Sequence, residues 1–126
     1  MRHFVAAMLL VVGIIHLLPV SGVLGAEQLG LLYGVAFSEP NLALLMRHRA
    51  VLFGLLGAFL ILAAFRPALQ PLAFAAAFVS VLSFLWLAWP VRSYSAEIRR
   101  VFFADVAALV CLALGVAAFI RERRQG

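Results

Sequence analysis

Four long apolar segments occupy nearly the whole chain and leave little room for a soluble fold. They cover residues 4–25, 43–65, 68–91 and 101–120. A helix needs about 20 mostly apolar residues to cross the hydrocarbon core of a bilayer, which is about 30 Å thick. Of the 126 residues, 67% are hydrophobic, and the mean hydropathy is +1.14. The sequence therefore predicts an integral membrane protein, because a soluble domain could not bury this much apolar surface.

We expect one domain, residues 1–126, with an all-α fold: an integral membrane four-helix bundle. In lipid every backbone polar group needs an internal partner, and the continuously apolar segments lack the alternation of barrel strands. The first segment follows Arg2, as in a signal peptide, but its apolar run is longer than that of a signal peptide. We expect it to be retained as a helix.

The charged residues predict an orientation. All ten basic residues are arginines, and the net charge is +5. Nucleic-acid binding is not expected, because the arginines lie mainly at predicted helix ends, where they face headgroups. With four spans, both termini lie on one side of the membrane. That side carries five arginines: Arg2, Arg66, Arg121, Arg123 and Arg124. The other side carries Arg92, Arg99 and Arg100 and, if they are counted as loop charges, Arg47 and Arg49. The excess of arginines favours cytoplasmic termini.

The ends of two helices show capping patterns. Ser38 is predicted to cap the second helix and Ser95 the fourth. At the membrane–water interface we expect Trp86, Trp89 and Tyr94, whose rings suit the headgroup level, together with a snorkelling Arg49.

Small residues recur at helical spacing and predict close helix–helix packing. They are Ala43, Ala50, Gly54 and Gly57; Ala73, Ala77 and Ser80; and Ala104, Ala108, Cys111 and Gly115. Cys111 is the only cysteine, so an internal disulfide and the paired-cysteine oxidoreductases are excluded.

Polar side chains recur at one depth in all four spans. At 1.5 Å per residue, one histidine in the first span, one in the second and the aspartate of the fourth all lie about 13–15 Å below the loop-bearing face. The third span contributes two serines at a similar depth. The sequence therefore predicts a polar layer made of His16, Arg47, His48, Asp105, Ser80 and Ser83.

The run Arg47-His48-Arg49 cannot share one helix face, since successive residues are about 100° apart. Arg47 lies on the small-residue stripe, so we expect it to face the other helices, and His48 lies between the two faces; we favour these two over Arg49 as members of the layer. Arg49 lies on the bulky face and is expected to snorkel towards headgroups.

The layer allows a structural and a functional interpretation. An unpaired arginine at mid-membrane costs about 3 kcal/mol, so Arg47 and Asp105 could form an ion pair, and His16 could bond a neighbouring helix. Alternatively, His16, Arg47, His48 and Asp105 could line a pocket. A haem between the two histidines, or a metal held with Asp105, lacks a supporting motif, so no metal and no cofactor are expected. A quinone-like or other lipid-like ligand fits better, with its head at Arg and His and its tail among Leu and Phe.

The stretch NLALLMRHRAVLFGLLGAFLILAAF, with HLLP in the first segment and LLYG in the first loop, resembles a group of small bacterial four-helix inner-membrane proteins of unknown function. These often carry the label phosphopantetheine adenylyltransferase. That soluble enzyme needs a T-x-x-G-H motif and a phosphate-binding loop, whereas the nearest pair here, Gly13 and His16, lies within a membrane helix.

Taken together, the residues predict a non-enzymatic membrane protein that binds a lipid-like ligand, or acts as a small subunit of a membrane complex or as a homo-oligomer. The alternative is a small membrane enzyme or proton-coupled transporter that uses His16, His48 and Asp105.

Overall fold

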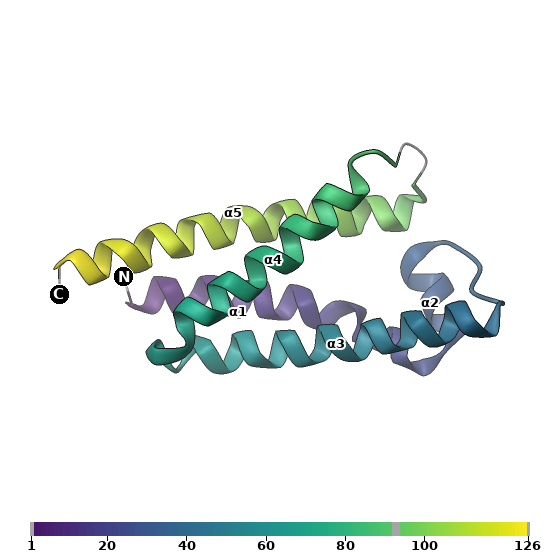
Figure 1. Ribbon diagram of the computed structural model, residues 1–126, viewed down its shortest axis with the longest axis horizontal. Coiled ribbons are helices and arrows are strands. Elements are labelled where there is room, and N and C mark those ends of the chain that lie inside the picture. The colour runs from purple at the N-terminus through teal and green to yellow at the C-terminus, as the bar shows by residue number, and fades with distance from the viewer. Residues whose placement is uncertain (1, 92–93, 126) are drawn as a thin grey trace.

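The computed structural model describes residues 2–91 and 94–125, and these form the expected all-α bundle (Figure 1). Arg92, counted above as a loop charge, lies outside the described residues. The elements are α1 (Arg2–Leu17), the 3-10 helix η1 (Leu18–Leu24), α2 (Ala26–Tyr33), α3 (Pro40–Ala64), the 3-10 helix η2 (Pro67–Leu69), α4 (Gln70–Ala88) and α5 (Ala96–Gln125). Within the described residues, four segments are long and apolar enough to cross a membrane: Arg2–Leu24, Pro40–Ala64, Pro67–Ala88 and Ala96–Gln125.

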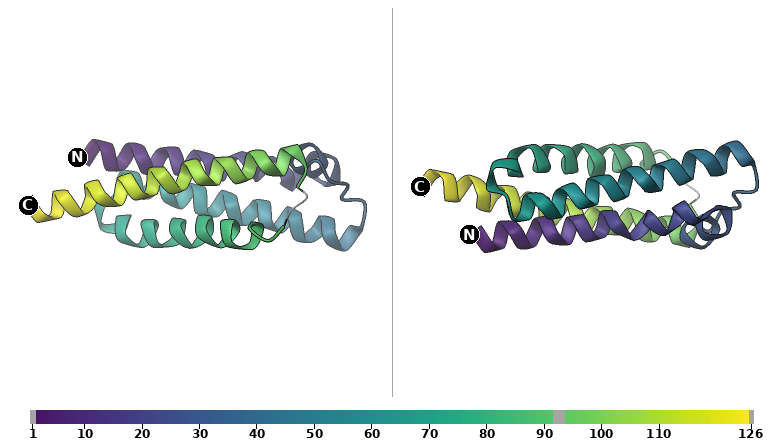
Figure 2. Two further views of the ribbon diagram at one scale, coloured as in Figure 1. Left: turned by 90° about the horizontal axis from the view of Figure 1, so that it is seen from above. Right: turned by 90° about the horizontal axis from the view of Figure 1, so that it is seen from below.

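The four long helices form a ring in the order α1, α3, α4 and α5. Helix α1 packs against α3 and α5, and α4 packs against α5 and, less extensively, against α3. The pairs α1/α4 and α3/α5 therefore face each other across the two diagonals. Both described ends of the chain lie at one end of the bundle, as four crossings require (Figure 2). At the other end α4 has diverged from α3, as Figure 1 shows.

Helices α1 and α3 cross with their backbones in contact. A Cβ atom built on Gly57 would lie 2.9 Å from the carbonyl oxygen of Gly13, and one built on Gly13 would lie 3.1 Å from the carbonyl oxygen of Gly57. The small-residue stripes do mark this and other contacts, because Ala50, Ala73 and Ala108 are also buried. Only glycine permits this approach, so the Gly13–Gly57 crossing fixes how α1 and α3 pack.

The first loop contains a helix that the apolar pattern did not predict. Helix α2 ends at Gly34, which has a positive φ of 66° and whose N–H bonds the Gly30 carbonyl. Three buried side chains, Leu29, Tyr33 and Phe37, form a second small core at the loop-bearing end. Helix α2 is thereby folded back over α3 and α5 instead of extending into water.

The capping prediction is confirmed for α5 and wrong for α3. The Ser95 hydroxyl accepts from the Ile98 N–H at 3.1 Å and donates to the Tyr33 carbonyl, so it caps α5 and ties it to α2. At α3 the cap is Glu39 and not Ser38, because the Glu39 carboxylate accepts from the Leu42 N–H at 2.7 Å.

The Glu39 cap makes the first turn of α3 sensitive to pH. Its bonds from the backbone N–H of Leu42, then from Asn41, lower the pKa of the Glu39 carboxyl from its ordinary value. A lowered folded-state pKa means that the cap is fully present above the unfolded pKa, about 4.3, and is lost as pH falls through the folded value. We expect the exchange protection of the Leu42 amide to fall as the pH drops below about 4.3, towards the protection measured in Glu39→Gln. Protection that stays constant over this range would contradict the cap.

Candidate functional site

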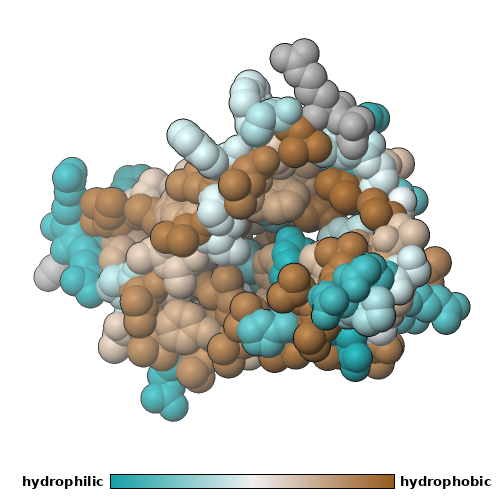
Figure 3. Space-filling view, turned by 45° about the vertical axis from the view of Figure 1, so that its right-hand side comes forward, coloured by the Kyte–Doolittle hydropathy of each residue, from teal (hydrophilic) through white to brown (hydrophobic). Residues whose placement is uncertain are grey.

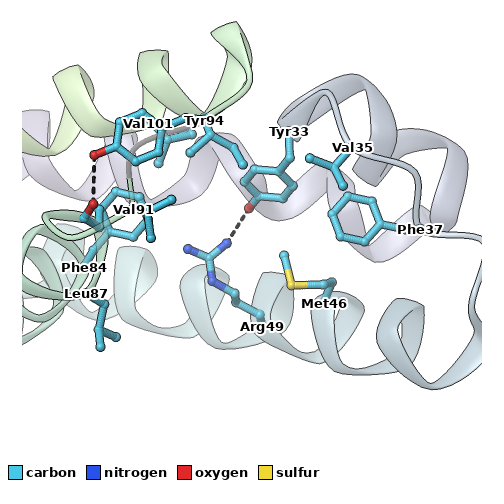
Figure 4. Close-up of a pocket in the computed structure, with 12 residues that line it drawn as sticks. Tyr33, Val35, Phe37, Met46, Arg49, Phe84, Leu87, Val91, Tyr94 and Val101 are labelled. Atoms are coloured by element: carbon cyan, nitrogen blue, oxygen red, sulfur yellow. Dashed lines mark hydrogen bonds between the residues drawn. The ribbon is translucent and has the colours of Figure 1, made fainter.

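A pocket of about 490 Å³ lies at the loop-bearing end, where α4 leaves α3. Its walls come from α2 and the loop after it, from α3, from the end of α4 and from the start of α5 (Figure 4). The lining residues are Tyr33, Val35, Phe37, Met46, Arg49, Phe84, Leu87, Ala88, Val91, Tyr94, Ile98 and Val101. Among these described lining residues Arg49 is the one charged side chain, so the described part of the pocket is apolar with one guanidinium.

Arg49 is held in place by aromatic side chains. Its Nη1 donates to the Tyr33 hydroxyl oxygen at 2.6 Å. The guanidinium carbon lies 4.5 Å from the centre of the Phe53 ring and 5.5 Å from that of Tyr33. Stacking of this kind favours a cation, particularly one shielded from water. The side chain therefore extends into the pocket, as Figure 4 shows.

The polar groups of the pocket are donors. Because the Tyr33 oxygen accepts from Arg49, its own O–H remains able to donate, and arginine has five N–H donors and no acceptor. The second hydroxyl, that of Tyr94, already donates to the Ala88 carbonyl at 2.8 Å. A ligand head in this pocket would therefore have to supply acceptors, such as carbonyl or carboxylate oxygens.

Beneath the pocket a second polar contact crosses the bundle along the α1/α4 diagonal. The His16 side chain is 3% exposed. Its Nδ1 donates to the Val12 carbonyl at 2.9 Å, and its Nε2 lies 3.0 Å from the Ser80 hydroxyl. Because a carbonyl only accepts, a neutral ring carries its proton at Nδ1, and Nε2 then accepts a hydrogen bond from the Ser80 hydroxyl.

Phe53 lies between the two polar groups. Its ring centre is 5.7 Å from that of His16 on one side, and Arg49 covers it on the other. Of the predicted layer, the structure thus joins His16 and Ser80 by a hydrogen bond across the bundle.

The structure does not form the Arg47–Asp105 ion pair considered above. In the described residues the side-chain ion pair is Arg100–Glu97, at 3.7 Å on the surface. Arg47 instead donates from Nε to the Val23 carbonyl of η1 at 2.9 Å. Asp105 is half-buried on α5.

The preference for Arg47 and His48 over Arg49 as residues of the interior is wrong, although Arg47 does reach another helix, η1. Arg47 and His48 are exposed, whereas Arg49 is half-buried in the pocket. Arg49 is turned towards protein because its Nη1 donates to Tyr33 of α2. In the described residues, His16, His48 and Asp105 do not gather into a set able to hold a metal ion.

The remaining predicted residues lie around these groups. Ser83 is exposed and donates to the Ser80 carbonyl at 3.0 Å, one turn earlier on α4. Trp86 and Trp89 are each 80% exposed at the end of α4, a placement compatible with an interfacial position. Tyr94 is turned inward instead and stacks on Phe102, with ring centres 6.1 Å apart.

Tyr33 is the site residue that sequence reasoning missed. It appeared in a loop sequence, LLYG, with no periodic pattern to indicate a helix. The glycine that follows it is a usual helix C-terminal signal and could have indicated α2.

Comparisons with models of known protein families, with curated proteins and with solved structures found no match to this chain.

Proposed function

We propose that this multi-pass membrane protein binds an amphipathic, lipid-like molecule in the pocket around Arg49. The observation that carries the proposal is an apolar chamber of about 490 Å³ with one cation in its wall. This volume lies in the usual range for small-molecule sites, which are mostly apolar with a few placed polar groups. The acceptor head would bond Arg49 and Tyr33, and the tail would lie against Phe84 and Leu87.

The place of the pocket supports a ligand that arrives through the bilayer. It lies at the last turns of α4, level with the exposed Trp86 and Trp89, whose side chains suit the headgroup region. Figure 3 shows a hollow in this part of the surface, with hydrophobic residues along much of its rim and hydrophilic residues beside them. Quinones and fatty acids both combine a carbonyl or carboxylate head with an apolar tail, and both fit this chemistry.

The charge distribution supports the orientation within this proposal. The end that bears the termini carries five arginines and one glutamate, whereas the loop-bearing end carries three glutamates and three arginines, or five arginines if Arg47 and Arg49 are counted as loop charges. By the positive-inside rule the termini lie on the cytoplasmic side of a bacterial inner membrane, and the pocket lies in the leaflet on the opposite side. Membership of a homo-oligomer or of a membrane complex stays a prediction.

The test is native mass spectrometry of the protein extracted gently with its lipids. We expect one small molecule per chain in the wild type and about tenfold lower retention in Arg49→Gln, because a hydrogen bond to a charged group is worth about 1.5–3 kcal/mol. Arg47→Gln is the matched control: it removes the same charge two residues away, outside the pocket.

Three outcomes are distinguishable. Loss in Arg49→Gln with retention in Arg47→Gln supports the proposal, and the retained mass gives the ligand class. Equal loss in both variants would assign the effect to charge alone. If the wild type carries no small molecule, and still carries none after a quinone or a fatty acid is added, the proposed function is wrong.

A further inference from the structure

The opposite end of the bundle has two hollows that the proposed function does not use. The first, of about 320 Å³, is lined by Arg2 of α1, by η2 and the start of α4, and by Phe119, Glu122 and Arg123 of α5. The second, of about 340 Å³, is lined by Phe4 of α1 and by Leu114, Ala117, Ala118 and Arg121 of α5. Both therefore lie between α1 and the last turns of α5.

The second hollow is an apolar groove with a cation at its end. Positions 114, 117, 118 and 121 follow the spacing of one helix face, so Leu114 and the two alanines lead along α5 to Arg121. Phe4, which is 41% exposed, forms the opposite wall. A groove of this kind suits a hydrocarbon chain that ends in an anionic group.

The first hollow holds a second cation in a fixed position. The guanidinium carbon of Arg123 lies 4.9 Å from the centre of the Phe119 ring, and this ring packs on Phe74 of α4 at 5.9 Å. Arg2 lines the same hollow from α1. An arginine stacked on an aromatic ring is pre-organised for a phosphate, which accepts two N–H bonds from it.

From these features we infer that the terminal end binds one anionic phospholipid, with an acyl chain in the Phe4–Leu114–Ala117 groove and its phosphate at Arg121, at the end of that groove. Arg123 lines the other hollow and adds to the positive charge of this end. Charge complementarity supports an anionic occupant, since the described residues of this end carry five arginines against Glu122. Basic pockets between membrane helices bind anionic headgroups in this way. This site is separate from the Arg49 pocket and does not depend on it.

The experiment titrates the delipidated full chain in detergent with long-chain phosphatidylglycerol or phosphatidylcholine and counts bound lipid by native mass spectrometry. We expect tighter binding of the anionic lipid by the wild type. Arg121→Gln should weaken it about fivefold, because an arginine near an anionic headgroup contributes about that much, and Arg123→Gln, on another side of α5, should weaken it less. Arg99→Gln is the control: it removes the same charge at the loop-bearing end and should leave binding unchanged, as should Arg49→Gln.

Two further arms separate the lipid from its headgroup. Ala117→Trp fills the groove without changing charge and should weaken the long-chain lipid, while soluble glycerol phosphate should bind poorly to every form. Equal weakening by Arg121→Gln and Arg99→Gln, or equal affinity for the two lipids, would overturn the inference. If glycerol phosphate binds as tightly as the lipid, the inference is also wrong, and the ligand of this site is a soluble phosphate ester.

Discussion

Gly57→Val is expected to be the most damaging single substitution in the bundle. A Cβ at this position would lie 2.9 Å from the Gly13 carbonyl oxygen and 2.9 Å from two atoms of Leu17. A backbone oxygen cannot move aside as a flexible side chain can, so α1 and α3 must separate. We expect a loss of about 3 kcal/mol in the free energy of unfolding, at the upper end of the range for overpacked cores, measured by titration with SDS from bilayer-like micelles.

Gly54→Ala is the control for this prediction. Gly54 lies one turn earlier on α3, and the nearest atom to its added Cβ is the end of the Val20 side chain, at 3.2 Å. That side chain can shift, and alanine favours a helix over glycine by about 1 kcal/mol. We expect little net change in the unfolding free energy. If both variants lose the same stability, the Gly13–Gly57 contact is not the reason.

His16→Ala should lower the unfolding free energy by about 3 kcal/mol, because it leaves a cavity in the core and removes the hydrogen bond that crosses the bundle. Helices α1 and α4 share few other contacts, so His16 and Ser80 connect elements that are otherwise joined through α3 and α5. Ser80→Ala should cost less, about 1 kcal/mol, as hydrogen bonds between membrane helices do.

The double variant decides whether the two side chains act together. If they do, adding Ser80→Ala to His16→Ala costs almost nothing further, because the bond is already lost. Fully additive losses would show that each residue stabilises the protein separately. His3→Ala is the control, since His3 is an exposed histidine on the same helix and should leave stability unchanged.

The sequence predicted the spans better than it predicted which side chains face inward. Apolar length alone locates a membrane helix, and the four segments were found within a few residues of their ends. In lipid, however, the outer face of a helix is as apolar as its core face, so periodicity does not show which is which. Small residues gave the remaining signal, and they correctly indicated Ala50 and Gly57 as buried.

The same reasoning failed at Arg47 and Arg49 because it treated α3 as one of four simple rods. Near its start α3 faces η1 on one side, where Arg47 bonds the Val23 carbonyl, and α2 on another, where Arg49 meets Tyr33. The apolar pattern did not predict α2. Because the placement of Arg49 depends on α2, its position in the wall of a pocket could not be predicted without that helix.

The long helices differ in length, and this difference determines how the protein fits bilayers of different thickness. At 1.5 Å per residue, the 25 residues of α3 and the 30 of α5 extend about 37 and 45 Å, whereas the 19 of α4 extend only about 29 Å. Helix α4 therefore matches a hydrocarbon core of about 30 Å, and the other two exceed it. In a thicker bilayer the end of α4, with the mouth of the Arg49 pocket, would lie below the headgroups, so hydrophobic mismatch would govern access to that pocket.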